Sequence, residues 1–114
     1  MGLGSDIAGG HVLSLFQVMV GAVQASKLRW RLLDETQKPL TVEEVFYMGT
    51  KGGGAFFGQV GSFEKGYEFD AVIVDDARLQ TPRKLTLKER LERVVYLSDD
   101  RDIDGKYAAG RRII

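Results

Sequence analysis

The chain has 114 residues, enough for one domain, and its 44% hydrophobic and 28% charged residues are typical of a folded globular protein. Its 16 basic and 16 acidic residues give zero net charge, which offers no reason to expect nucleic acid or an anionic membrane as partner and removes one protection against self-association. Cysteine is absent, so disulfides and thiolate metal sites are excluded, and His11 is the only histidine.

The most apolar segment, residues 12–23, is interrupted by polar residues and is too short to cross a bilayer. No basic region precedes it, so the N-terminus does not resemble a secretory signal peptide. We therefore expect a cytoplasmic protein that has no membrane partner.

The first chemically suggestive residue is Asp6, within the run Gly2-Leu3-Gly4-Ser5-Asp6-Ile7-Ala8-Gly9-Gly10. A carboxylate delivered on a glycine-rich loop after a short strand is typical of the catalytic face of a barrel enzyme. An aspartate before Ala-Gly-Gly is also an ordinary helix N-cap or turn residue, and the local pattern alone favours this second interpretation. Residues 2–5 would be the end of the strand.

A long amphipathic helix is predicted over residues 13–33. The apolar residues that recur at helical spacing are Leu13, Phe16, Val20, Val23 and Leu28. Basic residues gather in the last third, and a polar connector ending at Pro39 terminates the helix. We predict that Trp30 packs in a core or an interface and is not a cofactor platform.

A second helix is predicted to begin at a capping box formed by Thr41 and Glu44 and to end near Gly49 or Thr50. The following run Lys51-Gly52-Gly53-Gly54 is predicted to be the most flexible part of the chain. It does not match a phosphate-binding loop, because in such a loop the lysine follows the glycines. Thr50 could instead cap a short helix that runs through Phe57 and stops at Gly58.

The periodicity then changes to that of a small sheet. A buried strand is predicted over residues 71–74, with Asp70 before it as a turn or edge carboxylate. Thr86 is predicted to cap a helix that carries its apolar residues between Leu87 and Leu97. Residues 103–114 are predicted to form a hairpin that turns at Ala109-Gly110.

The run Asp100-Arg101-Asp102-Ile103-Asp104-Gly105 matches the opening of a calcium-binding EF-hand loop. The twelfth position of such a loop should hold a bidentate glutamate, and here it is Arg111. A cation at that position would repel calcium and leave the coordination incomplete. We therefore do not expect a calcium site.

Separate segments of the chain resemble the guanine deaminases of the metal-dependent amidohydrolase superfamily. Residues 2–10 resemble the eighth barrel strand and its loop, and Ala25-Ser26-Lys27-Leu28 lies where the eighth barrel helix would be. Residues 40–58 resemble the helix pair that follows the barrel. Residues 61–75, which read Gly-Ser-Phe-Glu-Lys-Gly-Tyr-Glu-Phe-Asp-Ala-Val-Ile-Val-Asp, resemble the return into the small β domain.

The resemblance implies a zinc hydrolase that converts guanine to xanthine and ammonia. In that family the eighth-strand aspartate binds the metal and takes part in proton transfer, and Asp6 is the residue that matches it. The family site also needs a His-x-His pair, two further histidines and a glutamate, none of which is present here. His11 matches no ligand position of the family, and we expect it to be an ordinary loop histidine.

We therefore expect the C-terminal portion of a (β/α)8 barrel enzyme plus part of its small β domain, with an α+β fold in isolation. Residues 1–58 would hold the last barrel strand and the C-terminal barrel helices, and residues 59–114 a partial β domain with one helix and a hairpin. Because a catalytic zinc site needs about three protein ligands, we expect the chain alone to bind no zinc and to be inactive.

In a complete barrel, the rest of the barrel would cover one surface of the 13–33 helix. We expect this surface to bind either a second copy of the chain or the missing barrel portion itself. The residues expected to be exposed on this surface are Phe16, Val20, Val23 and Trp30. An alternative of another class is a non-catalytic folding or oligomerisation module derived from a truncated amidohydrolase, which would fold without metal.

Overall fold

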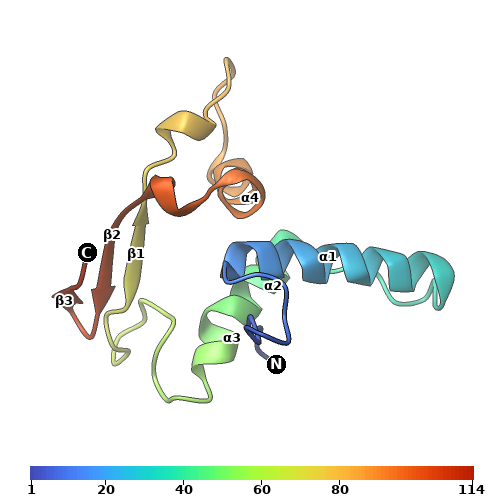
Figure 1. The fold of residues 1–114 in the computed structure, drawn as a ribbon, viewed down its shortest axis with the longest axis horizontal. Coiled ribbons are helices and arrows are strands. Elements are labelled where there is room, and N and C mark those ends of the chain that lie inside the picture. The colour runs from blue at the N-terminus through green and yellow to red at the C-terminus, as the bar shows by residue number, and fades with distance from the viewer.

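A computed structural model describes residues 1–114 as an α+β fold in which helices and a small sheet lie side by side (Figure 1). The elements in chain order are α1 (Leu15–Leu32), α2 (Val42–Gly49), α3 (Lys51–Gly54), β1 (Ala71–Val74), the 3-10 turn η1 (Ala77–Leu79), α4 (Leu87–Leu97), the 3-10 turn η2 (Asp100–Asp102), β2 (Ile103–Ala108) and β3 (Arg111–Arg112). The predicted fold class is confirmed.

The sheet is antiparallel, with β2 between β1 and β3. The strand over residues 71–74 and the hairpin are confirmed, but the prediction that this strand is buried is wrong, since Val72 and Ile73 are 53% and 44% exposed. Ala109 and Gly110 have φ angles of 47° and 76°, and two positive φ angles in a two-residue hairpin are characteristic of a type I′ turn. Asp70 stabilises this turn, because its Oδ1 accepts a hydrogen bond from the backbone N–H of Ala109 at 2.8 Å. Asp70 is thus the turn carboxylate that the sequence predicts.

Capping boxes begin two of the helices. The hydroxyl of Thr41 accepts from the N–H of Glu44, whose carboxylate accepts from the N–H of Thr41, as predicted. Thr86 and Glu89 repeat this arrangement at α4. A short helix, α3, follows Thr50 as predicted, and Thr50 is its N-cap residue. Its side chain does not cap this helix, because the hydroxyl donates to the carbonyl of Phe46 in the preceding helix, and α3 ends at Gly54 and not at Phe57.

The core lies where α2 and α4 meet one face of α1. Its buried members are Met19 and Val23 of α1, Val42 and Val45 of α2, and Val95 of α4. Phe16 and Val20 pack against this cluster. The prediction that Val23, Phe16 and Val20 would be exposed is therefore wrong, because α2 and α4 cover the face that was assigned to a missing sheet.

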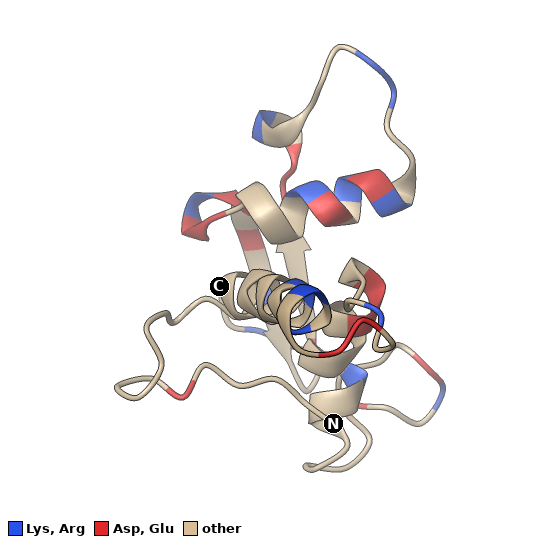
Figure 2. Cartoon of the chain, turned by 90° about the vertical axis from the view of Figure 1, so that its right-hand side faces the viewer, with Lys and Arg blue, Asp and Glu red and all other residues tan.

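Charge is unevenly distributed over this framework. Charged residues are concentrated on α4 and the turn after it, whereas α1 carries none before Lys27 (Figure 2). The C-terminal half of α1 extends away from the other elements (Figure 1). There Trp30 is 38% exposed, and its Nε1 donates to the carbonyl of Glu35 at 3.1 Å.

No helix of the chain has the length and apolar composition needed to cross a membrane.

Candidate functional site around Asp6

The N-terminal segment reaches its position by crossing the glycine-rich helix α3. The N–H of Leu3 donates to the carbonyl of Met48 at 3.0 Å. A Cβ atom on Gly2 would lie 2.6 Å from the Cα of Gly53, and one on Gly52 would lie 2.8 Å from the carbonyl oxygen of Met1. Glycine is thus required on both sides of this crossing. The run predicted to be the most flexible is instead a helical turn that anchors the segment before Asp6.

Residues 2–5 form no strand. A strand needs a hydrogen-bonded neighbour, and the contacts of this segment are with α2 and α3 and not with the sheet. The segment therefore delivers Asp6 to a loop without itself belonging to a sheet.

Asp6 lies at the start of a tight turn and not at a helix N-cap, since the residue before α1 is Ser14. Its carbonyl accepts hydrogen bonds from the N–H groups of Gly9, at 2.9 Å, and Gly10. Asp6 and Ala8 have φ angles of 44° and 84°, in the left-handed region that residues other than glycine rarely adopt. Such conformations cost free energy and occur often at functional sites.

The carboxylate of Asp6 lies over Gly9, where a Cβ atom would be only 2.7 Å from its Oδ2. Asp6 is exposed, and no side-chain hydrogen bond or ion pair holds its carboxylate. It is therefore a carboxylate presented on a tightly folded loop and open to a ligand that comes from outside the chain.

The residues of this chain do not form a metal site by themselves. Nowhere do three or more histidine, aspartate or glutamate side chains converge. His11 lines a groove between α1 and the C-terminal end of α4, together with residues such as Val20 and Tyr96, and Asp6 is not part of this lining. One exposed carboxylate does not fit the requirement of about three protein ligands for catalytic zinc.

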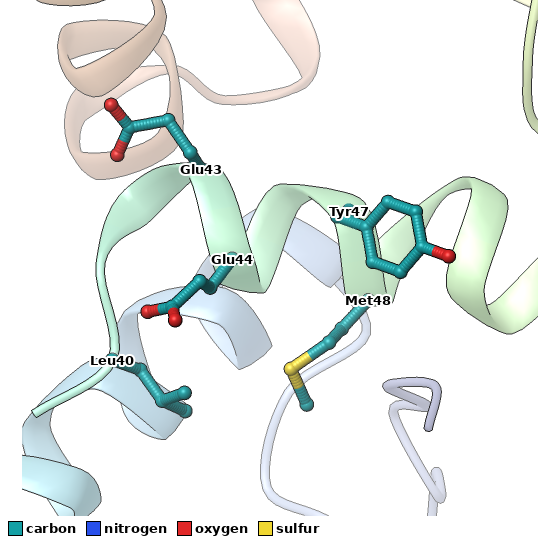
Figure 3. Close-up of a pocket in the computed structure, with 5 residues that line it drawn as sticks. All are labelled: Leu40, Glu43, Glu44, Tyr47 and Met48. Atoms are coloured by element: carbon teal, nitrogen blue, oxygen red, sulfur yellow. The ribbon is translucent and has the colours of Figure 1, made fainter.

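A second hollow lies along α2 and offers no better site. It is lined by Leu40, Glu43, Glu44, Tyr47 and Met48 (Figure 3). Both carboxylates already have structural partners, since Glu43 pairs with Lys88 at 2.6 Å and Glu44 completes the capping box of α2. The pKa of Glu43 is lowered chiefly by the side chain of Lys88. These carboxylates therefore stabilise the helices and are not free to bind a ligand in the hollow.

The run that resembles an EF-hand is also occupied by structural contacts. Asp102 is buried and is bound by the guanidinium of Arg78, whose hydrogen bonds lower the pKa of this carboxyl group. Asp99, immediately before the run, is bound in the same way by the side chain of Arg101. The carboxylate at the third position of the run is therefore neutralised by an arginine, and the backbone enters β2 in place of a calcium loop.

Comparison with known proteins assigns the family. The sequence profile of the amidohydrolase family matches residues 1–113, and the chain therefore belongs to the amidohydrolase family. Within it, the chain is similar to guanine deaminases. It is 35% identical over 120 residues to the guanine deaminase of Dictyostelium discoideum and 32% identical over 126 residues to that of Homo sapiens.

Solved structures agree with this assignment. A crystal structure of guanine deaminase from C. acetobutylicum with bound guanine in the active site matches 99% of the chain at 50% identity, with a TM-score of 0.93. E. coli guanine deaminase matches 99% of the chain at 28% identity, with a TM-score of 0.81. The match to the Dictyostelium relative covers 99% of this chain but 26% of that protein. The match to the C. acetobutylicum structure covers 99% of this chain but 27% of that chain. It thus spans about a quarter of the length of these relatives.

Proposed function

We propose that residues 1–114 are the C-terminal part of a zinc-dependent guanine deaminase, which converts guanine and water to xanthine and ammonia. The main support is the 50% identity and the TM-score of 0.93 to the C. acetobutylicum enzyme, over 99% of this chain. Residues 1–58 would belong to the barrel and residues 59–114 to the small β domain of the whole cytoplasmic enzyme.

In this proposal Asp6 is the metal ligand and catalytic carboxylate that the chain contributes. Its support is the exposed carboxylate without a partner, on a loop in which Asp6 and Ala8 both have positive φ angles. The remaining ligands and the groups that recognise guanine lie in the part of the enzyme outside these residues. The chain alone would accordingly hold no zinc and turn over no guanine.

The first experiment is a guanine deamination assay on the purified chain with added zinc, paired with metal analysis of the same sample. The expected result is no turnover and no stoichiometric zinc. Turnover with bound zinc would contradict the proposal, because the ligands would then have to come from several copies of the chain, with His11 as the first residue to substitute.

The second experiment places the chain in a complete enzyme. Residues 1–114 replace the matching quarter of the C. acetobutylicum guanine deaminase, and the chimera is compared with its Asp6→Asn variant. We expect an active chimera that loses at least about a thousandfold in kcat and loses zinc affinity on substitution, since Asn removes the charge of a ligand. An active Asp6→Asn variant would contradict the role of Asp6, and a folded but inactive chimera would contradict the proposed function of the chain.

The second candidate function is a non-catalytic folding or oligomerisation module. It is favoured by the large apolar side chains on the surface, such as Phe56 and Phe57 at 88% and 80% exposure. This candidate requires stable folding without metal and a defined oligomer of the chain alone, measured by light scattering.

A further inference from the structure

The turn that carries Asp6 is not attached by its own backbone to any other element of the chain. Its hydrogen bonds are internal, from the N–H groups of Gly9 and Gly10 to the carbonyl of Asp6. No backbone hydrogen bond joins residues 4–13 to another helix or to the sheet. The place of Asp6 therefore depends on the segments that precede and follow this turn.

The preceding segment restricts Asp6 more closely than the following one. The side chain of Leu3 packs against the buried core, and its N–H donates to the carbonyl of Met48 in α2 at 3.0 Å. From Leu3 to Asp6 the chain can span at most about 11 Å. From Asp6 to Leu15, where α1 begins, it can span about 32 Å. The anchor at Leu3 is thus the nearer and the tighter of the two.

Before Leu3 the segment lies against α3, next to the N-terminus (Figure 1). A Cβ atom on Gly2 would be 2.6 Å from the Cα of Gly53, and one on Gly52 would be 2.8 Å from the carbonyl oxygen of Met1. Carbon atoms pack at about 3.5–4.0 Å, so a methyl group on Gly2 would move the segment about 1 Å away from α3. The absence of side chains at this contact therefore determines how closely the segment approaches α3.

The opposite side of α3 is fixed to the chain that leads into the sheet. A Cβ atom on Gly54 would be 2.5 Å from the carbonyl oxygen of Val60. At 3.6 residues per turn, Gly52 and Gly54 point about 200° apart around the helix. Lys51 adds an ion pair to Glu64 at 2.7 Å on the same connection. Helix α3 is thus held on one side and supports the Asp6 segment on the other.

We propose that Gly2, Gly52 and Gly53 are positioning residues for Asp6, because their backbone contact sets the place at which its carboxylate is presented. The inference rests on the proposed function for the catalytic role of Asp6. Asp6 is exposed, and no partner within the chain holds its carboxylate, so the backbone determines where it lies. A displacement of about 1 Å at a reacting group can cost about a hundredfold in rate.

The test makes one chemical change, glycine to alanine, at three places in the chimera with the C. acetobutylicum enzyme. Gly2→Ala inserts a methyl group between the segment and α3. Gly4→Ala is the matched control nearer to Asp6, where a Cβ atom would meet nothing within 4 Å and the φ angle is not positive. Gly54→Ala is the control for general destabilisation, since it strikes Val60 on the other side of α3. The measurements are kcat and KM for guanine, the melting temperature and a crystal structure of each variant.

Gly2→Ala should lower kcat by about tenfold to a hundredfold and leave KM within about threefold, with Asp6 displaced by about 1 Å in its crystal structure. Gly54→Ala should lower the melting temperature and leave kcat and the place of Asp6 unchanged. Gly4→Ala should change none of these quantities. Full activity of Gly2→Ala, or an equal loss of kcat in Gly54→Ala, would overturn the proposal.

Failure of the proposed function gives a different result. An inactive chimera, or an active Asp6→Asn variant, would contradict the proposed function whatever the glycine variants do. The crystal structures would then still test the positioning role. Displacement of Asp6 in Gly2→Ala alone would support that role, and an unmoved Asp6 in this variant would overturn it.

Discussion

Arg78 binds the carboxylate of Asp102 through two hydrogen bonds, from Nε to Oδ1 at 3.0 Å and from Nη2 to Oδ2 at 2.7 Å. Asp102 is 3% exposed, and its Oδ2 also accepts from the N–H of Asp99 at 2.9 Å. The carbonyl of Asp102 accepts from the N–H of Asp75, at the end of β1. This one residue therefore ties η1, η2 and the ends of two strands together.

Asp102→Asn should destabilise the chain, because an amide cannot accept both guanidinium hydrogen bonds and leaves Arg78 only the more exposed Asp99, at 3.3 Å, as a charge partner. The measurement is the urea midpoint at pH 7 by circular dichroism. Asp100→Asn makes the same chemical change at an exposed neighbour and should leave the midpoint unchanged. Equal midpoints for the two variants would show that the ion pair contributes nothing to stability.

The ion pair of Arg78 and Asp102 also predicts how the stability of the chain changes at acidic pH. Hydrogen bonds from Arg78, followed by that from Asp99, lower the pKa of Asp102 below its ordinary value of 3.8. A carboxyl group whose pKa is lower in the folded state contributes stability above the unfolded value and loses it as the pH falls through the folded value. The urea midpoint of the wild type should therefore fall below about pH 4. Asp102→Asn should show a smaller fall over the same range, and an equal fall would contradict this assignment.

Substitution of Met19 is predicted to have a large effect on stability. This residue of α1 is 2% exposed and lies in the buried cluster with residues of α2 and α4. Met19→Ala should lower the free energy of unfolding by about 2–5 kcal/mol, because it leaves a cavity in a core that has few other buried residues. Gln17→Ala on the exposed side of the same helix should change it by less than about 0.5 kcal/mol. Urea unfolding at pH 7 distinguishes the two. A small effect at Met19 would mean that α1 does not pack against α2 and α4 in solution.

Local sequence predicted the parts of this fold that neighbouring residues determine. The capping box at Thr41 and the hairpin turn at Ala109 depend on residues within a few positions of each other, so both could be identified without the structure. The burial of one face of α1 could not be predicted, because Val23 shares its buried cluster with Val95, which lies more than seventy residues away in the chain. Both faces of α1 are apolar, and the choice between them depends on this long-range contact.

In the candidate site, too, local sequence predicts some features, and others depend on contacts between distant residues. Asp6 is predicted as a site residue because the glycine-rich run around it resembles the eighth-strand loop of the guanine deaminases, and the structure adds its exposure and its positive φ angle. The function of Gly52 and Gly53 could not be predicted, since the backbone that approaches them belongs to residues 1–2. A run of glycines signals either flexibility or close approach, and only the three-dimensional contact distinguishes these.

Thr86→Ala should destabilise the chain by about 0.5–2 kcal/mol, because it removes the hydroxyl that accepts from the N–H of Glu89 at the start of α4. Thr86→Ser keeps that hydroxyl and should restore most of the stability. The side chain of Arg83, followed by hydrogen bonds from Thr86, lowers the pKa of Glu89 to about 2. The difference between the Ala and Ser variants should therefore persist at pH 5. Equal urea midpoints for Ala and Ser would show that the cap does not form.

The loop that carries Asp6 predicts opposite outcomes for two exchanges between alanine and glycine. Ala8 has a φ angle of 84°, so Ala8→Gly should relieve backbone strain and leave stability unchanged or raised by up to about 1 kcal/mol. Gly10→Ala should lower it by about 1–3 kcal/mol, because the new Cβ would overlap the carbonyl oxygen of Ser5.

Urea unfolding of the two variants gives the sign of each change, and hydrogen exchange at the N–H groups of Gly9 and residue 10 reports whether the turn at Asp6 persists. Ala8→Gly should retain protection at both groups, because the carbonyl of Asp6 still accepts from them. Gly10→Ala should lose it, since the turn must open to place the methyl group. Changes of the same sign would mean that this turn is absent in solution, and the support that it lends to a functional role for Asp6 would be withdrawn.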